Sequence, residues 1–288
     1  MSLDNFGIVY KNKDLYDYNT YKVHSIVNYL IIVSNVVKLT NLIDYLNKNN
    51  IKYFVIGNGS NIILPSVYDG VVIKLDMNEL EINNNEVTVG ASYMLNRLAM
   101  DTIEHNLSGL EWASGIPGSV GGSAYGNAGA YNDAIGNYIE EIEVLENNHI
   151  KVLKKNDIFF EYRSSSLQKR DLIILKLTLK LKKGSKQESL ALVKDRLERR
   201  LASQPLEYPS AGSVFRNPEG LYAGKLIEDL GFKGKSIGGA EISSKHANFI
   251  INKGNATGED IKELIQLIIK EVKNKYNIDL VLEQKIID

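Results

Sequence analysis

The sequence predicts an α+β protein of two parts, and three observations lead to this fold class. Helical and strand patterns alternate irregularly to about Lys183, unlike the regular alternation that builds a doubly wound sheet. A polar stretch with a glycine, residues 182–188, then breaks the pattern before a charged helix. The remaining residues repeat helix and strand patterns on a smaller scale, so we expect a larger N-terminal module and a smaller C-terminal α+β domain.

Hydrophobic periodicity assigns the N-terminal elements. Apolar runs or alternations indicate strands, whereas apolar residues at helical spacing indicate amphipathic helices. An Asn-rich turn between two alternating segments indicates a hairpin. Strands are predicted over residues 28–34, 52–57, 70–76, 80–92 (the hairpin) and 171–183, and helices over residues 39–50 and 94–107.

The C-terminal elements follow the same rules, and one helix start is well defined. Thr257 can cap the helix that follows it, and Glu259 and Asp260 then lie in the first turn, where negative charge is favourable. Helices are predicted over residues 189–203, 221–230 and 257–276, and strands over residues 247–252 and 279–287.

The composition excludes several classes of function. A net charge of −1 gives no bulk attraction to nucleic acid or to anionic lipid. Cysteine is absent, which removes disulfides and thiolate nucleophiles, and the four widely spaced histidines argue against a metal site. The longest apolar stretch, Val27–Val33, is far too short for a membrane span, and the N-terminus carries no secretory signal pattern. We therefore expect a soluble, cytoplasmic protein.

The first segment with chemical meaning is a glycine-rich loop after a predicted strand. It comprises Gly57, Asn58, Gly59, Ser60 and Asn61. Its glycines permit positive φ angles, which turn successive backbone N–H groups toward one point and suit a phosphate oxygen. The loop lacks both the GK[ST] of a P-loop and the GxGxxG-to-helix pattern of an ordinary Rossmann site. A phosphate-binding loop and a plain hairpin both remain open at this point.

A second glycine-rich segment runs from Gly109 to Tyr131. It is almost uncharged and carries Trp112 and Val120, so it differs from a polar surface linker. Glycines in such a setting let a backbone lie closely against a large flat ligand. One loop able to hold phosphates and another able to lie along a ring together suggest a dinucleotide cofactor.

Three further segments carry groups suited to catalysis. Arg163 lies among aromatic residues in FEYRSSSL, Ser213 lies in SAGSVFRNP, and Glu283 lies in the terminal apolar strand. Each of these residue types, taken alone, is more often an ordinary surface or turn residue. Their combination with the two glycine-rich segments is what gives them meaning.

These segments together resemble the UDP-N-acetylenolpyruvoylglucosamine reductase family. GNGSN, SGIPGSVGGSAYGNAGAY, YRSSS, QPLEYPSAGSVFRNP, GGAEISSKHANFIIN and the closing Leu280-x-x-Glu283 follow the family in order, from about Thr20 to the C-terminus. Only about eight residues separate Arg163 from the strand at Asp171. The chain therefore resembles the shorter, second type, which lacks an inserted substrate-clamping segment.

The resemblance implies a fold, cofactors and a substrate. The fold would be a two-subdomain flavin-binding module of the vanillyl-alcohol-oxidase type over residues 1–185, divided near residue 75, with a substrate domain over residues 186–288. FAD would be the cofactor, NADPH the hydride donor and a small sugar nucleotide the substrate. The reaction would be the step that completes UDP-N-acetylmuramate for peptidoglycan synthesis. The protein is expected to be a monomer or weak oligomer. Besides the residues of the first loop, FAD would contact Ile116, Pro117, Gly118, Ser119, Gly121 and Gly122.

The resemblance also assigns catalytic and substrate-binding residues. Reduction of an enolpyruvyl ether builds negative charge on the substrate's carboxylate and then needs a proton on the neighbouring carbon. Arg163 would grip that carboxylate, Ser213 would donate the proton, and Glu283 would assist polarisation. Asn217, Arg216 and Tyr125 would contact the substrate.

The sequence departs from the family pattern at two places. A segment that usually ends in Gly-Gly ends here in His24-Ser25, which places side chains at the expected edge of the cofactor pocket, and Arg216 replaces the more usual lysine. A related FAD-dependent oxidase or dehydrogenase, or a flavin-binding protein without turnover, are the alternatives to an active reductase. His246 is expected to have a structural role.

Overall fold

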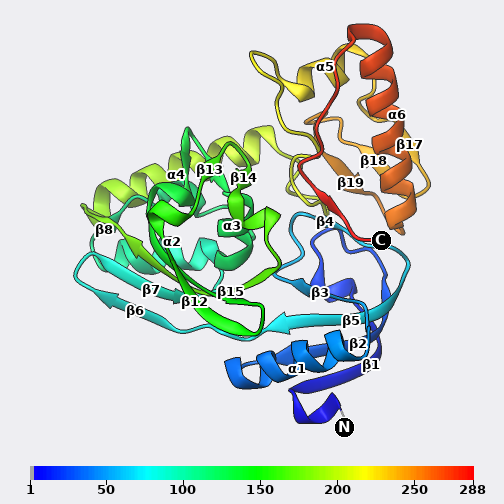
Figure 1. The fold of residues 1–288 in the computed structure, drawn as a ribbon. Coiled ribbons are helices and arrows are strands. Elements are labelled where there is room, and N and C mark those ends of the chain that lie inside the picture. Colours follow the sequence, from blue (N-terminus) through cyan, green and yellow to red (C-terminus); the bar gives the residue numbers. More distant parts are fainter. Residues whose placement is uncertain (1–2) are drawn as a thin grey trace. The chain divides into compact units, whose positions relative to one another are not determined.

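The computed structural model describes residues 3–288, which form two compact units (Figure 1). Unit 1 contains the chain up to Lys11, Tyr29–Asn58 and Gly70–Glu198. Unit 2 contains Asn12–Asn28, Gly59–Asp69 and Arg199–Asp288. The predicted boundaries near residues 75 and 185 divide the chain into domains that are continuous in sequence. Each of the two units combines separate stretches of the chain, so these boundaries stay predictions.

Unit 1 contains a five-stranded sheet with the strand order β12-β11-β15-β7-β6 (Figure 1). Each pair of neighbouring strands is antiparallel. The pairing of β11 with β15 shifts register twice: β11 has an extra residue between Ile139 and Glu141, and β15 has an extra residue opposite the step from Glu143 to Val144. The strands are β6 (Leu80–Asn83), β7 (Glu86–Gly90), β11 (Ile139–Glu146), β12 (His149–Lys154) and β15 (Leu172–Lys180).

Two helices share a hydrophobic core with this sheet. α2 (Leu95–Glu104) contributes Leu98, and α3 (Val120–Gly126) contributes Ala124. Trp112, which is 2% exposed, enters the same core from the segment between the two helices. Burial of this apolar surface fixes α3, and therefore the second glycine-rich segment, on the sheet.

A four-stranded sheet has the order β1-β2-β5-β3, and α1 follows its second strand. Within unit 1, Tyr53–Ile56 of β3 pairs in parallel with residues 71–74 of β5. Asn35 caps α1, because its side chain accepts the N–H of Lys38. The elements are β1 (Ile8–Asp14), β2 (Ile26–Val33), α1 (Val36–Lys48), β3 (Tyr53–Ile56) and β5 (Val67–Leu75).

Short two-stranded pairs connect the larger elements of unit 1. β8 pairs with β16, β9 with β10, and β13 with β14, all antiparallel. α4 (Lys186–Ser203) follows β16. The short strands are β8 (Leu107–Ser108), β9 (Gly129–Ala130), β10 (Asp133–Ala134), β13 (Phe160–Glu161), β14 (Ser164–Ser165) and β16 (Lys182–Lys183).

Unit 2 is built on a three-stranded antiparallel sheet with two helices. The strand order is β17-β18-β19, and a separate parallel pair joins β20 to β4. α6 buries Ile261, Leu264, Ile265 and Ile268 along one face. The elements are β4 (Ile62–Ile63), α5 (Ala223–Asp229), β17 (Ser236–Ile237), β18 (Ala240–Ile242), β19 (Ile250–Asn252), α6 (Gly258–Tyr276) and β20 (Lys285–Ile286).

The predicted cap of α6 is confirmed, whereas the predicted last strand is wrong in extent. The Thr257 side chain accepts the N–H of Asp260 at 3.1 Å, and the Asp260 carboxylate accepts the N–H of Thr257 at 2.9 Å. The strand expected over residues 279–287 is reduced to β20, with an isolated bridge from Leu282 to Phe215. β1, β11 and β12 were not among the predicted elements.

No helix within residues 3–288 is long and apolar enough to cross a membrane. The same residues contain no group of three His, Asp or Glu side chains placed to hold a metal ion.

Candidate cofactor and active site

The first two residues of the glycine-rich loop, Gly57 and Asn58, lie beside the second glycine-rich segment within unit 1. The Asn58 side chain donates to the carbonyl of Pro117 at 2.5 Å. A Cβ on Gly57 would lie 2.6 Å from the Ser119 hydroxyl oxygen, so only glycine allows this approach. Lys74 donates to the Gly57 carbonyl at 3.0 Å and fixes the end of β3, and burial lowers the pKa of this lysine. The structure thus brings together the two segments that the sequence assigned to one cofactor.

α3 begins inside the second segment and depends on its serine and glycines. The Ser119 side chain accepts the N–H of Gly122 at 3.3 Å and caps the helix. A Cβ on Gly121 would lie 2.8 Å from Cβ of Ala91. Glycine is therefore needed at Gly121 for close packing of helix on sheet, a reason additional to the ligand contact that the sequence suggested.

The first loop has the donors that a pyrophosphate requires. Among residues 3–288, no acceptor takes the backbone N–H of Asn58, Gly59, Ser60 or Asn61. Gly59 has a φ of +62°, which orients consecutive peptide groups as in an anion-binding turn. The residues present therefore fit the diphosphate of FAD.

Gly59 is also packed tightly inside unit 2. A Cβ at this position would collide with the carbonyl of Tyr18. The Gly59 carbonyl accepts the N–H of Thr20 at 3.1 Å. The segment around Thr20 therefore packs against the first glycine-rich loop at Gly59.

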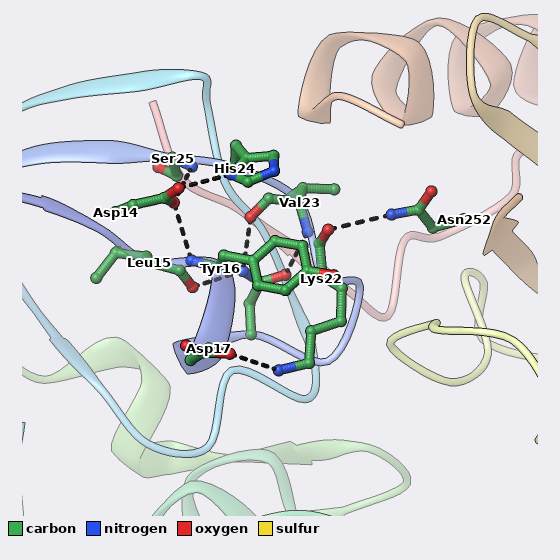
Figure 2. Close-up of polar contacts among 10 residues, drawn as sticks. Asp14, Leu15, Tyr16, Asp17, Lys22, Val23, His24, Ser25 and Asn252 are labelled. Carbon is green, nitrogen blue, oxygen red and sulfur yellow. Dashed lines mark hydrogen bonds and ion pairs between the residues drawn. The ribbon is translucent and has the colours of Figure 1, made fainter. Parts of the chain in front are cut away.

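The segment Asp14–Ser25 is held in shape by the Asp14 carboxylate (Figure 2). This carboxylate accepts the N–H groups of Tyr16 at 3.0 Å and Ser25 at 3.2 Å, and His24 Nδ1 lies 2.6 Å from it. The His24 ring stacks on Tyr16 with centroids 4.7 Å apart. Burial raises the pKa of Asp14, but the hydrogen bonds from His24, Ser25 and Tyr16 outweigh this and hold the pKa below its ordinary value.

The departure from Gly-Gly at residues 24 and 25 is accommodated without strain. Neither His24 nor Ser25 has a positive φ, so this backbone does not need glycine. The His24 side chain is 68% exposed, and Ser25 is buried, with its hydroxyl making no hydrogen bond to any described residue. The family's usual glycines are thus not required for this segment to fold.

Arg163 occupies the turn between β13 and β14 in unit 1. Its φ is +54°, and its guanidinium donates to the Gly129 carbonyl at 2.6 Å while lying 5.6 Å from the Tyr162 ring centroid. Ser165 in the same hairpin donates to the carbonyl of Tyr125 at 2.7 Å. Arg163 and Tyr125 are both predicted to contact the substrate. The hydrogen bond to Gly129 restrains the guanidinium of Arg163, and the bond from Ser165 restrains the backbone at Tyr125.

Ser213 and Glu283 come together in unit 2. The backbone N–H of Glu283 donates to the carbonyl of Val214 at 2.8 Å, and Phe215 forms a bridge with Leu282. On its other side, Ser213 forms a bridge with Phe249. The two segments run antiparallel, which places the predicted proton donor and the predicted acid on adjacent stretches of backbone.

Two predicted substrate residues follow Ser213 directly. The Arg216 side chain is half-buried, and its Nε is buried without a hydrogen-bond partner among residues 3–288. The side-chain Oδ1 of Asn217 accepts the N–H of Ala223 at 3.1 Å and so supports the start of α5. Asn217 thus has a structural contact besides its predicted one.

His246 has the contacts of a structural histidine. Its Nδ1 accepts the N–H of Asn248 at 3.2 Å, and its ring packs edge-on against Phe249. Burial lowers the pKa of His246, which favours the neutral ring that this hydrogen bond needs.

Three buried amides in unit 2 were missed by sequence reasoning. Asn248 exchanges hydrogen bonds with both backbone groups of Phe215, and Asn252 donates to the carbonyls of Tyr21 and Lys22. Gln284 contacts Tyr21 and the residues before Ser213. Their partners lie far away in the sequence, so the only available signal was a polar residue at an apolar position of a strand pattern.

Comparison with known proteins agrees with this arrangement. A family model for an FAD binding domain matches residues 27–148, and one for the C-terminal domain of UDP-N-acetylenolpyruvoylglucosamine reductase matches residues 204–287. A reductase of this name from Caldanaerobacter subterraneus subsp. tengcongensis is 40% identical over 98% of this chain and 94% of its own length. The chain belongs to the UDP-N-acetylenolpyruvoylglucosamine reductase family.

Further members of the reductase family support the same assignment. The protein of that name from Thermotoga petrophila is 42% identical over 92% of this chain and 94% of its own length. The crystal structure of the Thermus caldophilus reductase superposes with a TM-score of 0.83 at 31% identity and covers 98% of both chains. The predicted α+β fold, with a flavin-binding module and a C-terminal domain, is confirmed, and the chain is an FAD-containing oxidoreductase.

Proposed function

We propose that this protein reduces the enolpyruvyl ether of UDP-N-acetylglucosamine-enolpyruvate to UDP-N-acetylmuramate, with NADPH as the hydride donor. Its relatives carry the name of this reductase over nearly their whole length. The observation in the structure that supports this function best is the backbone hydrogen bond of 2.8 Å from the N–H of Glu283 to the carbonyl of Val214, the residue after Ser213. A proton donor and an acid fixed in one frame suit the protonation that follows hydride addition.

The cofactor role falls on the two glycine-rich segments. Backbone N–H groups of Asn58 to Asn61 would hold the diphosphate of FAD, and Ile116, Pro117, Gly118, Ser119, Gly121 and Gly122 would lie along the cofactor. FAD, when bound, supplies the hydride that adds to the terminal carbon of the enolpyruvyl double bond. The protein contributes position and charge.

Arg163 is assigned to the substrate's carboxylate. After hydride addition, negative charge spreads from the adjacent carbon onto this carboxylate. A guanidinium remains charged and can bind both carboxylate oxygens, and its contact with the Gly129 carbonyl at 2.6 Å pre-orients it. Tyr125, Arg216 and Asn217 are assigned to the rest of the sugar nucleotide.

Ser213 is assigned to the proton transfer and Glu283 to polarisation. A hydroxyl is a weak acid, but the enolate carbon is strongly basic, so a positioned serine suffices as donor. Glu283 would act as a hydrogen-bonding neighbour of the developing charge.

The cellular setting follows from the same proposal. A sugar-nucleotide reductase of peptidoglycan precursor synthesis would act in the cytoplasm, upstream of cell-wall assembly and hence of cell shape and division. We propose a monomer or weak oligomer, without nucleic-acid or membrane partners. Sedimentation at several protein concentrations tests this oligomeric state.

One spectroscopic experiment separates the proposed function from its alternatives. Purified holoprotein should be yellow, should lose its flavin absorbance with NADPH under anaerobic conditions, and should regain it only when the enolpyruvyl sugar nucleotide is added. Colour loss without substrate-driven recovery would favour an oxidase or dehydrogenase acting on another substrate. Colourless protein that takes up no FAD would contradict both enzyme assignments.

A further inference from the structure

The amide of Gln284 occupies a buried position directly after Glu283. We propose that Gln284 is a positioning residue, which fixes the turn that carries Ser213 against the segment that carries Glu283. The inference rests on the proposed roles of those two residues. Gln284 itself would touch neither substrate nor cofactor.

Gln284 makes its contacts with both ends of its amide. Its Nε2 donates to the carbonyls of Ala211 at 3.1 Å and Gly212 at 3.2 Å, the two residues before Ser213. Its Oε1 accepts the hydroxyl of Tyr21 at 2.9 Å. The Gln284 residue is 3% exposed, so water does not compete for these bonds.

The surroundings allow only one orientation of this amide. Ala211 and Gly212 offer carbonyl oxygens, which can only accept, so the NH₂ group must face them. The hydroxyl of Tyr21 must then donate to the amide oxygen, and burial raises the pKa of Tyr21, which keeps this hydroxyl protonated. If the amide were flipped, its oxygen would face the two carbonyl oxygens, and neither hydrogen bond could form.

The turn before Ser213 needs such support because its own geometry is permissive. Gly212 has a φ of +76°, and a Cβ there would meet nothing within 4 Å. Packing therefore does not fix this residue, and glycine itself is conformationally free. The bond from Gln284 to the Gly212 carbonyl supplies a directional restraint one residue before the proton donor.

The segment that carries Glu283 is also bonded to Asn61, the last residue of the first glycine-rich loop. The Asn61 side chain donates to the carbonyl of Glu283 at 3.0 Å, and the N–H of Lys285 donates to the carbonyl of Asn61 at 3.0 Å. Residues 283–285 thus connect the Ser213 turn with the end of the cofactor loop inside unit 2. Asn61 contacts the backbone of Glu283 and Lys285 and not the Gln284 amide, so a change of the Gln284 side chain should disturb proton donation without changing how the flavin is reduced.

The first test is Gln284→Met in the holoenzyme, which keeps the side-chain length and removes all three hydrogen bonds. We expect reoxidation by the enolpyruvyl substrate to slow by about 10- to 100-fold, the scale of a misplaced catalytic group. Flavin reduction by NADPH should stay within about 2-fold of wild type, because the reduction step does not use Ser213. Equal slowing of both half-reactions, or no slowing of either, would overturn the proposal.

The second test is Gln284→Glu, in which the positioning role should appear as a change in the pH dependence of the reoxidation rate. A protonated carboxyl can donate to one carbonyl and accept from Tyr21, whereas a charged carboxylate would face the two carbonyls with like partial charge. Burial raises the pKa of such a group, to about 8–9 in documented cases. Reoxidation by this variant should therefore recover toward the wild-type rate as the pH is lowered through that range. A pH profile parallel to wild type would contradict the positioning role.

A matched control and a readout without turnover keep the test decisive. Asn252→Ala removes another buried amide of unit 2, one that serves the Tyr21 and Lys22 carbonyls, and should lower the melting temperature with the ratio of half-reaction rates unchanged. Hydrogen exchange of residues 210–216 should accelerate in Gln284→Met. Unchanged exchange in residues 210–216 would overturn the positioning role, whether or not the wild-type protein turns over the substrate. Inactivity of the wild-type protein on the substrate would count against the proposed function alone.

Discussion

Glu283 and Val214 are joined by a backbone hydrogen bond of 2.8 Å, which places the proposed acid opposite the residue that follows the proposed proton donor. Because this bond belongs to the backbone, it survives side-chain substitution at either catalytic position. Ser213 and Glu283 can therefore be changed one at a time without loss of the frame that holds them. This makes the separate roles of the two side chains accessible to experiment.

Ser213→Ala should separate the two half-reactions. Flavin reduction by NADPH should be nearly unchanged, while reoxidation by substrate should slow by about 10²-fold or more, the usual contribution of a positioned acid. Anaerobic stopped-flow absorbance measures both rates. Ser236→Ala, at an exposed serine of the same unit, is the control and should match wild type. Equal slowing of both half-reactions in Ser213→Ala would mean that Ser213 is structural.

Arg163→Lys should weaken turnover of the substrate with FAD retained. A lysine keeps the charge but cannot bind a carboxylate through two parallel hydrogen bonds. The expected result is a reoxidation rate reduced by about 10-fold or more, since a charged hydrogen bond contributes about 1.5–3 kcal/mol. FAD content is read from the absorbance of the purified variant.

Arg170→Lys is the matched control for Arg163. Arg170 also makes two parallel contacts, to the Glu146 carboxylate at 2.7 and 2.8 Å, but has no proposed catalytic role. It should lower stability and leave substrate turnover unchanged. Loss of flavin from Arg163→Lys, or equal turnover in both variants, would contradict the assignment of Arg163.

Gly59→Ala should impair FAD retention much more than Gly220→Ala. Both glycines have similar positive φ angles, +62° and +68°, so both substitutions incur about 1–2 kcal/mol of backbone strain. A Cβ at position 59 would in addition collide with the Tyr18 carbonyl, whereas one at position 220 meets nothing within 4 Å. Fluorescence titration of the apoproteins with FAD measures the difference. Equal affinities of the two variants for FAD would show that FAD binding does not depend on the packing of Gly59 against Tyr18.

The Glu146 carboxylate should account for part of the loss of stability in acid. Hydrogen bonds from Arg170 and Lys151 lower the pKa of Glu146 from 4.5 to about 2 in the folded protein. Its contribution is therefore present above its unfolded pKa and is lost as the pH falls through the folded pKa. Glu146→Gln should reduce the free energy of unfolding at neutral pH by about 1.5–3 kcal/mol and flatten its decline between pH 4.5 and 2. Urea unfolding across this range measures both, and an unchanged acid slope would contradict the assignment.

The sequence predicted those features whose signal is local. The Thr257 cap is one, because a capping side chain and its partner lie within one helical turn. The glycine-rich segments are another, because positive φ and close packing restrict the residue type. The motif order then identified the family.

Features that depend on distant or irregular pairing were missed. β11 has an extra residue between Ile139 and Glu141, which breaks the two-residue alternation by which a strand is recognised. The terminal strand changes partner from Phe215 to Ile62 along its length, so an apolar pattern that predicted one long strand yields only β20. Gln284 meets Tyr21 across 263 residues, and no local pattern encodes that contact.

The chemistry itself is tested most directly by the position of deuterium in the product. The proposal places hydride on the terminal carbon and a solvent-exchangeable proton, delivered through Ser213, on the carbon that bears the carboxylate. Turnover in D₂O should therefore give a lactyl ether with deuterium on the carbon that bears the carboxylate, as read by proton NMR; the methyl group is not diagnostic, because the N5–H of a reduced flavin also exchanges with solvent. Protium on the carboxylate-bearing carbon of the product formed in D₂O, or the absence of any lactyl product, would contradict the account.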